Sequence, residues 1–171
     1  MRTLEPVDEL DARYSSEGVD PIAWARARGQ LEAAEVYWLS TVRPDGRPHV
    51  TPVLAVWLDR AMYFTTGPEE RKARNLAGNP HCVLTTGSNA LNERLDLVVE
   101  GAAVRVTDDA ALRQVAGAYD AKYGSDWHFE VRDGAFLHPD GRNVALVFEV
   151  APSTAFGFGK GEFSQTRWRF E

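Results

Sequence analysis

The feature that most constrains the fold is a pair of strand patterns followed directly by a helix start. Residues 48–58 and 61–66 are rich in β-branched and aromatic side chains, which favour strands. Asp59-Arg60 between them is short enough for a tight hairpin turn. A basic helix follows and is expected to end before Asn79-Pro80. The pattern predicts two antiparallel strands, of which the second ends beside the N-terminus of a helix.

Hydroxyls, cations and an amide gather where this second strand passes into the helix: Thr65, Thr66, Arg71, Lys72 and Asn75. Cations and hydroxyls near a helix N-terminus suit an anion, so we interpret the group as a phosphate seat. The alternative is two ordinary strand threonines and a solvated basic helix face. Glu69 and Glu70 would repel a phosphate, so the seat depends on Arg71 and Lys72 pointing away from them.

The first of the two strands has two different faces. Its even positions form one apolar face, which we assign to the core: Val50, Pro52, Leu54, Val56 and Leu58. Its odd positions form a mixed face that we expect to meet a ligand or a partner. Pro52 cannot donate to a strand ladder, so the strand is bulged or lies at a sheet edge there.

Further patterns predict a β-rich chain with peripheral helices. Strands are expected over 37–42, 81–86, 96–106 and 143–150, with short closing strands over 154–159 and 166–170. A helix is expected after Asp20-Pro21, where Asp20 can cap it, with Trp24, Ala27, Leu31 and Ala34 as one apolar stripe. Another helix is expected after the cap Thr107-Asp108-Asp109. The segment 125–142 has mixed pattern and two turn signals, and resembles a functional loop or lid. Six or more strands linked mostly by hairpins indicate a closed antiparallel barrel.

Composition limits the functional classes. The chain has 171 residues, 44% of them hydrophobic, and a net charge of -6, which argues against nucleic-acid and anionic-membrane binding. No apolar run approaches the roughly 20 residues of a membrane helix. Cys82 is the single cysteine, so no intramolecular disulfide is possible, and the cytoplasm is the expected compartment. We expect residues 1–18 to form a mobile acidic arm and 19–171 a single domain.

No catalytic or metal-binding motif stands out. The four histidines lie on separate predicted elements, without HExxH or CxxC spacing, so no metal site is expected. The sequence contains no GxSxG motif, and Cys82 reads as a buried hydrophobe. Among the site residues only His49 is a candidate acid or base, and its interpretation as a structural strand histidine is favoured over that role.

Taken together, residues 37–42, 45–53 and 63–66 followed by 71–76 resemble the pyridoxamine 5′-phosphate oxidase-like, flavin-binding split-barrel family. The similarity spans about 37–106, and more loosely 143–170. The run Lys72-Ala73-Arg74-Asn75-Leu76 is similar to a helix start in the deazaflavin branch, the coenzyme F420-dependent oxidoreductases. The resemblance implies a β-rich α+β fold: a six- to eight-stranded antiparallel split β-barrel with two to four peripheral helices.

The resemblance also implies a homodimer with two cofactor sites at its interface. Residues that would line the ring through backbone contacts are His49, Val50, Thr51, Pro52 and Val53. The phosphate end would be held by Thr65, Thr66, Arg71, Lys72 and Asn75. Arg167 and Trp168 match a C-terminal Arg and Trp of the family that reach the cofactor. An acidic F420 tail would need a basic groove, for which the candidates are Arg43, Arg47 and Lys160.

The implied function is hydride transfer between F420, or alternatively FMN, and a small organic substrate. Trp127, His128 and Phe129 would shape the substrate pocket. The second reading is a non-enzymatic flavin- or F420-binding or cofactor-sequestering protein. Three departures from the family bear on this: the basic substrate-binding segment of the vitamin-oxidising members is not found, Asp96 replaces a Gln beside the expected phosphate, and Glu70 stands where some deazaflavin-binding relatives have a cation.

Overall fold

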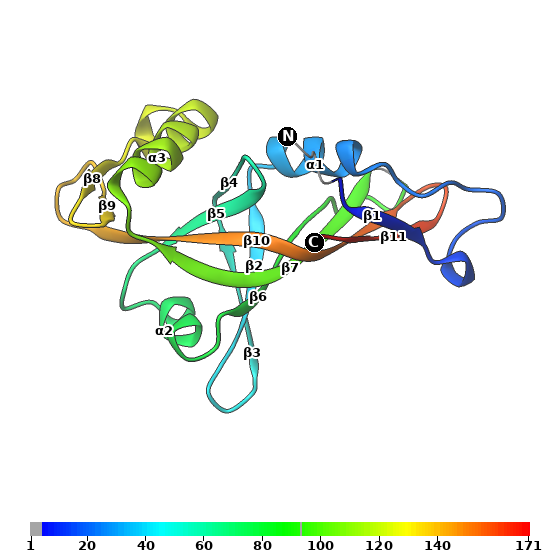
Figure 1. Ribbon diagram of the computed structural model, residues 1–171, viewed down its shortest axis with the longest axis horizontal. Helices are drawn as coiled ribbons and strands as arrows, with labels where there is room; N and C mark the ends of the chain where they lie inside the picture. Colours follow the sequence, from blue (N-terminus) through cyan, green and yellow to red (C-terminus); the bar gives the residue numbers. More distant parts are fainter. Residues whose placement is uncertain (1–4, 93) are drawn as a thin grey trace.

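The computed structural model describes residues 5–92 and 94–171. Figure 1 shows an elongated molecule built along two long strands, β7 and β10. The strands are β1 (Val7–Leu10), β2 (Tyr37–Val42), β3 (Pro48–Val53), β4 (Ala55–Leu58), β5 (Ala61–Thr66), β6 (His81–Thr86), β7 (Leu95–Val106), β8 (Glu130–Arg132), β9 (Ala135–Leu137), β10 (Val144–Gly159) and β11 (Ser164–Arg169). The helices are α1 (Trp24–Ala33), α2 (Arg71–Gly78) and α3 (Asp109–Tyr123), with 3₁₀ turns η1 (Ala12–Tyr14) and η2 (Ser125–Trp127).

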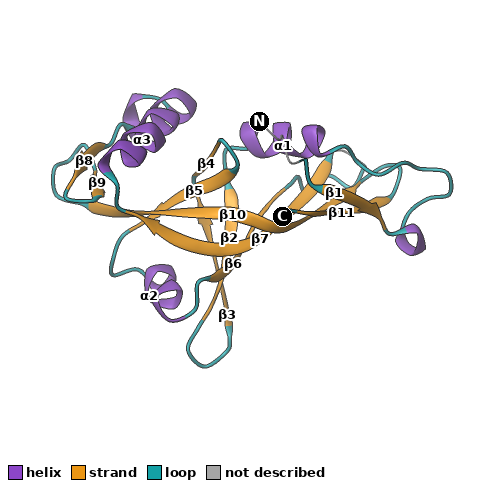
Figure 2. Ribbon diagram, viewed as in Figure 1, coloured by secondary structure: helices purple, strands orange, loops and turns teal. Residues whose placement is uncertain are grey.

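The strands form one branched antiparallel sheet. Its main path runs β1-β11-β10-β7-β6-β2-β3, and β5, followed by β4, joins the first half of β10. Strands β2 to β7 together with β10 form the barrel part, which stays open because, among the described residues, no pairing joins β3 to β4. The predicted β-rich, antiparallel split-barrel class with peripheral helices is confirmed (Figure 2). Strands β1, β8 and β9 raise the total beyond the six to eight expected.

The predicted orientation of the first strand pattern is wrong. Val50 and Pro52 of β3 are exposed, and the pattern is interrupted at Leu54, so residues 48–58 form two strands instead of one. In β4, Ala55 and Val56 are both buried. Strand β3 is the last strand on its path, which confirms the edge position expected from Pro52. The strict alternation fails because the chain leaves one ladder and enters another at Leu54.

Strand β10 continues through the segment where a break was expected. Ala151-Pro152-Ser153 stays in the strand, and the register with β7 shifts between Pro152 and Thr154. This bulge accommodates the proline without ending the sheet. The opposite residue is Gly101, where an added Cβ would lie 2.6 Å from the Ala151 carbonyl oxygen. The strand pair can therefore approach this closely only with glycine on β7.

We expect Gly101→Ala to destabilise the protein by about 1–3 kcal/mol, because a methyl group would press on backbone that cannot move aside. The measurement is the free energy of unfolding in urea. Gly117→Ala is the matched control: Gly117 lies within α3, a Cβ there meets nothing within 4 Å, and alanine is the better helix former. Equal stabilities of the two variants would contradict the close approach.

The buried hydrophobic residues form two clusters. The first fills the barrel and is closed by Trp24, Ala27 and Leu31 of α1, which confirms the predicted apolar stripe. The helix begins at Trp24 with Ala23 as its N-cap, so the predicted cap by Asp20 is wrong. The second part lies under α3, whose Asp108 cap accepts a hydrogen bond from the Ala111 N–H, as expected.

Two segments without predicted structure join the sheet. Residues 7–10 of the expected N-terminal arm pair with β11, Val7 opposite Arg169. The side chains of β1 are mostly exposed, so no apolar alternation marked the strand, and backbone hydrogen bonds hold it. The expected loop over 125–142 contains η2 and the β8–β9 hairpin, with Phe129 and Phe136 buried against α3. Within the described residues, no helix has the length and apolarity needed to cross a membrane.

Candidate functional site

A polar cluster forms where α2 meets the β2–β3 hairpin close to its turn. Both elements project from the same side of the sheet in Figure 1. The Asn75 side-chain amide donates a hydrogen bond to the Thr41 hydroxyl at 3.0 Å, and both residues are buried. Thr41 lies opposite His49 in the β2–β3 register. We call Thr41, Arg43, His49, Arg71, Lys72 and Asn75 the basic cluster.

Three buried polar atoms of the basic cluster have no hydrogen-bond partner within the described residues: Arg43 Nε, His49 Nδ1 and Asn75 Oδ1. Buried polar groups are nearly always paired, and unpaired ones are expected where a ligand or solvent completes the site. Desolvation lowers the pKa of His49, and the nearby charges of Arg43, Lys72 and Arg71 lower it further. The imidazole is therefore neutral at pH 7, and the cluster gathers positive charge around unpaired polar atoms.

Lys72 does not meet the condition set for the phosphate seat. The seat depends on Arg71 and Lys72 pointing away from the acidic helix start, but the Lys72 ammonium pairs with the Glu70 carboxylate. The side chain of Lys72 is only 8% exposed, whereas that of Glu70 is 52% exposed. Glu70 also accepts a hydrogen bond from the Gly67 N–H at 2.8 Å. A nearly buried ammonium needs a counter-charge, and this carboxylate supplies it.

A groove of about 650 Å³ adjoins the Glu70 side of the cluster. Thr65, Thr66 and Glu70 line one wall, and Trp127 and Phe129 of the expected lid line the other, which brings these two predicted sets together. His128 lies outside this groove and faces Asp120 on α3. Sequence reasoning missed the further lining residues His138, Arg142 and Asn143, because only the β9–β10 turn carries them here.

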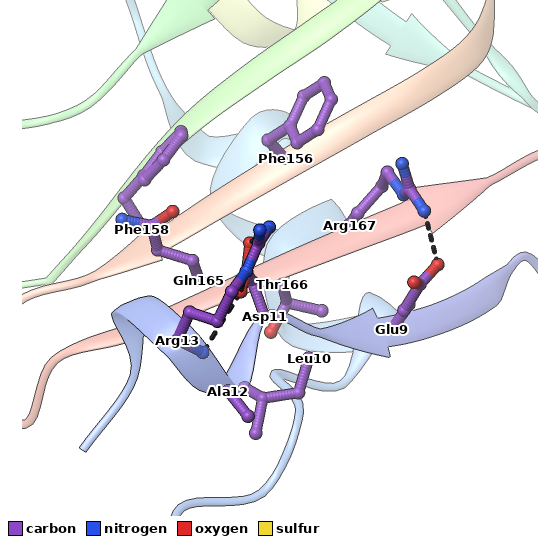
Figure 3. A pocket seen from close by; sticks show the side chains of 10 residues that line it. All are labelled: Glu9, Leu10, Asp11, Ala12, Arg13, Phe156, Phe158, Gln165, Thr166 and Arg167. Atoms are coloured by element: carbon purple, nitrogen blue, oxygen red, sulfur yellow. Dashed lines mark hydrogen bonds and ion pairs between the residues drawn. The ribbon is translucent and has the colours of Figure 1, made fainter.

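A second pocket, of about 510 Å³, lies at the opposite end of the sheet and contains Arg167 (Figure 3). Arg167 pairs with Glu9 at 2.6 Å, and Phe156 and Phe158 of β10 line the same pocket. Thr66 pairs with Leu146 and Arg167 with Phe156, ten residues further along β10. At about 3.3 Å per strand residue, Arg167 lies roughly 30 Å from the groove within one chain.

Trp168 does not reach either pocket. Its side chain has 0% exposure, packs edge-on against Trp24, and donates its indole N–H to the Ile22 carbonyl oxygen at 3.1 Å. The predicted contact between Trp168 and a cofactor is therefore wrong for this chain. Asp96 likewise lies away from the seat, where it pairs with Lys160 at 2.9 Å.

The remaining site residues fall into two groups. His49, Thr51 and Val53 are on the half-buried to buried side of β3, and Val50 and Pro52 are on its exposed side. Arg43 joins the basic cluster, whereas Arg47 pairs with Asp45 in the hairpin turn. The expected basic groove is therefore not assembled from its three candidates. Thr41 was missed, although the strand register that places it opposite His49 could have indicated it. Within the described residues, no group of three His, Cys, Asp or Glu side chains could hold a metal ion.

Comparison with known sequences gives two matches. Residues 23–154 match the model of the family described as pyridoxamine 5′-phosphate oxidase. A pyridoxine/pyridoxamine 5′-phosphate oxidase from Bacteroides thetaiotaomicron is 26% identical over 148 residues, which is 85% of this chain. The match covers 61% of that relative, so the chain spans about three fifths of its length.

Comparison with solved structures gives likenesses at low identity. An F420 reductase is 24% identical with a TM-score of 0.54, over 75% of this chain and 94% of the other. A putative 5-nitroimidazole antibiotic resistance protein from Bacteroides thetaiotaomicron is 16% identical, with a TM-score of 0.63 and coverages of 95% and 90%. A heme binding protein from Mycobacterium smegmatis is 18% identical, with a TM-score of 0.67 and coverages of 86% and 58%. At these identities the likenesses show the fold.

Proposed function

Because the chain belongs to the pyridoxamine 5′-phosphate oxidase family, we propose that it is an oxidoreductase that binds a flavin or deazaflavin through a phosphate. F420 is the preferred cofactor and FMN the alternative. The observation that carries the proposal is the basic cluster, with its three unpaired buried polar atoms beside two cations of α2. An anionic ligand with several hydrogen-bonding groups fits this combination of charge and unsatisfied polar atoms.

The proposed division of work follows the positions of the residues. Arg71 and Lys72 hold the phosphate, with Asn75 and Thr66 beside them. Strand β3 holds the ring through backbone contacts over 49–53. An edge strand has main-chain N–H and C=O groups that no further strand uses, so β3 can offer them to a planar ligand.

The hydride chemistry is supplied by the bound cofactor, and the protein provides binding, orientation and exclusion of water. Trp127 and Phe129 give the groove an aromatic wall on which a small organic substrate can lie. His49, which is neutral, can accept or donate one hydrogen bond at the cluster, and we assign no proton transfer to it.

We further propose that two copies form a homodimer through the outer face of β3, β2, β6 and β7. Register places Pro52, Trp38, Thr85 and Val98 in one row across this face, and Val50, Ser40, Val83 and Glu100 in the next. Trp38 and Val50 are 51% and 54% exposed. A large aromatic and branched apolar side chains gathered on one sheet face favour burial against a partner. In such a dimer, the pocket containing Arg167 of one copy can complete the cofactor site of the other.

We expect Trp38→Glu to convert the dimer to a monomer, because two carboxylates would be buried near one another without partners. Analytical ultracentrifugation measures the change. Leu91→Glu is the matched control, since Leu91 is 71% exposed in a loop and should leave the mass unchanged. A monomeric wild-type protein would contradict the proposed interface.

A non-enzymatic, cofactor-sequestering role is the second candidate. The ion pair between Glu70 and Lys72 favours this second role. The carboxylate of Glu70 would repel a bound phosphate, whereas some deazaflavin-binding relatives have a cation at this position. Turnover of reduced cofactor by an added acceptor distinguishes the two functions.

The test of the proposed function is a fluorescence titration of the purified protein with F420 and FMN in parallel. We expect saturable binding of F420, with weaker or no binding of FMN. Tight binding of FMN alone would reverse the choice of cofactor and keep the phosphate seat. Binding of neither would overturn the oxidoreductase proposal.

A further inference from the structure

We infer that Glu70 is an internal competitor for the phosphate seat: its carboxylate occupies the donors that a bound phosphate needs, and it thereby selects against doubly charged phosphate monoesters. This inference rests on the proposed function, because it concerns the same seat. It assigns a role to the residue that departs from the family pattern.

The contacts of Glu70 are those of a bound anion. One carboxylate oxygen accepts from the Gly67 main-chain N–H at 2.8 Å, and the other accepts from the Lys72 ammonium. The Thr66 hydroxyl donates to the Gly67 carbonyl oxygen at 3.2 Å and is not one of these donors. A main-chain N–H and an ammonium at the start of a helix are donors by which proteins bind phosphate. In this structure, the protein's own Glu70 carboxylate binds these donors.

The seat is nevertheless incomplete with Glu70 in it. Asn75, 2% exposed, keeps its side-chain oxygen without a partner, and His49 Nδ1 and Arg43 Nε are also unpaired. His49 lies within the charged surroundings of Arg43, Lys72 and Arg71. A carboxylate with two oxygens satisfies the Gly67 and Lys72 donors and leaves these atoms unpaired.

Glu70, rather than Lys72, is the partner of this pair that can turn away from the seat. Its side chain is 52% exposed and rotates about three single bonds, whereas Lys72 is nearly buried and stays in place. A ligand phosphate that takes over Lys72 therefore displaces Glu70 toward the groove and the solvent. The displaced carboxylate remains attached to the N-cap of α2, close to the new anion.

This proximity distinguishes ligands by their charge. The repulsion between two anions scales with the product of their charges and falls only slowly over a few ångströms. A phosphate monoester such as the terminal phosphate of FMN carries nearly two negative charges at pH 7, whereas the phosphodiester of F420 carries one. Glu70 should therefore weaken the binding of FMN more than that of F420.

The experiment compares wild type with Glu70→Gln and Glu69→Gln by titration with FMN and F420. Glutamine keeps an oxygen that can accept from Gly67, so the helix start is preserved, and circular dichroism checks this. Glu69→Gln is the matched control, because it removes the same charge one residue away, from a side chain that is 85% exposed and paired with Arg74. We expect Glu70→Gln to raise FMN affinity about tenfold and F420 affinity clearly less, with Glu69→Gln changing neither.

The outcomes separate the inference from the proposed function. Equal affinities for wild type, Glu70→Gln and Glu69→Gln would overturn the role of Glu70 and leave the phosphate seat standing. An equal gain for both cofactors would overturn the charge selection. Failure of all three proteins to bind either cofactor would overturn the proposed function itself, and the inference with it. If Glu70→Gln bound FMN while wild type and Glu69→Gln did not, the result would support the role of Glu70 as a competitor.

Discussion

Lys72→Met should lower the affinity for the phosphate-bearing cofactor by about 30-fold or more. Removal of one partner from a buried, hydrogen-bonded charge pair typically weakens binding by 2 kcal/mol or more, which corresponds to that ratio. Methionine keeps an apolar side chain of similar length at this buried position of α2, so the change removes the ammonium rather than the packing. Glu70 is half exposed and can turn to solvent, so no buried charge is left behind.

Arg74→Met is the control for this prediction. It removes one positive charge from the same helix, but Arg74 is exposed and paired with Glu69, away from the basic cluster. Fluorescence titration of both variants with F420 and FMN gives the comparison. If both variants lose affinity equally, the effect is one of overall charge, and Lys72 does not form the seat.

Trp168→Ala should destabilise the protein by about 3–5 kcal/mol, the range for removal of a large buried aromatic side chain. The indole fills the barrel against Trp24, and its N–H bond to the Ile22 carbonyl would be lost. The Ile22 N–H donates to the Thr166 hydroxyl at 2.9 Å. Ile22 therefore binds β11 through both its N–H and its carbonyl group, and these two bonds fix the segment that leads into α1. Urea unfolding measures the loss.

Arg167→Ala is compared with Trp168→Ala, because the two variants separate a structural role from a ligand-binding role at this end of β11. The ion pair of Arg167 with Glu9 is exposed, so its removal should leave the stability nearly unchanged. Trp168→Ala protein that remains folded should keep its cofactor affinity, because the indole is completely buried. If Trp168→Ala lost cofactor affinity while its stability stayed unchanged, the structural role assigned to Trp168 would be contradicted.

The barrel was predictable because its strands carry local signals. The runs 37–42, 61–66 and 81–86 coincide with β2, β5 and β6, and the Asp59 turn adopts a positive φ of 55°. Strands held by main-chain pairing alone, such as β1, left no side-chain pattern to read. The bulge in β10 was predicted to be a break between two strands. A proline removes one ladder hydrogen bond, but its presence does not show whether the strand continues beyond it.

The site was predictable in its residues but not in their partners. Thr66, Arg71, Lys72 and Asn75 are near one another in sequence, so their gathering followed from a strand that leads into a helix. The Lys72 ammonium can bind either Glu70 or a ligand, and in this structure it binds Glu70. The spacing of these residues in the sequence does not determine which of the two it binds. The burial of Trp168 depends on Gly157 across the sheet, where an added Cβ would lie 2.5 Å from the indole.

The pairing of β1 with β11 sets the order in which the molecule can be completed during synthesis. Residues 7–10 leave the ribosome early, yet their partners are residues 166–169, more than 150 positions later. Contacts of such sequence separation form slowly, because a long loop must first be closed. The β1–β11 edge and the pocket beside it can therefore form only after residues 166–169 have been synthesised, later than local pairs such as β2 with β3.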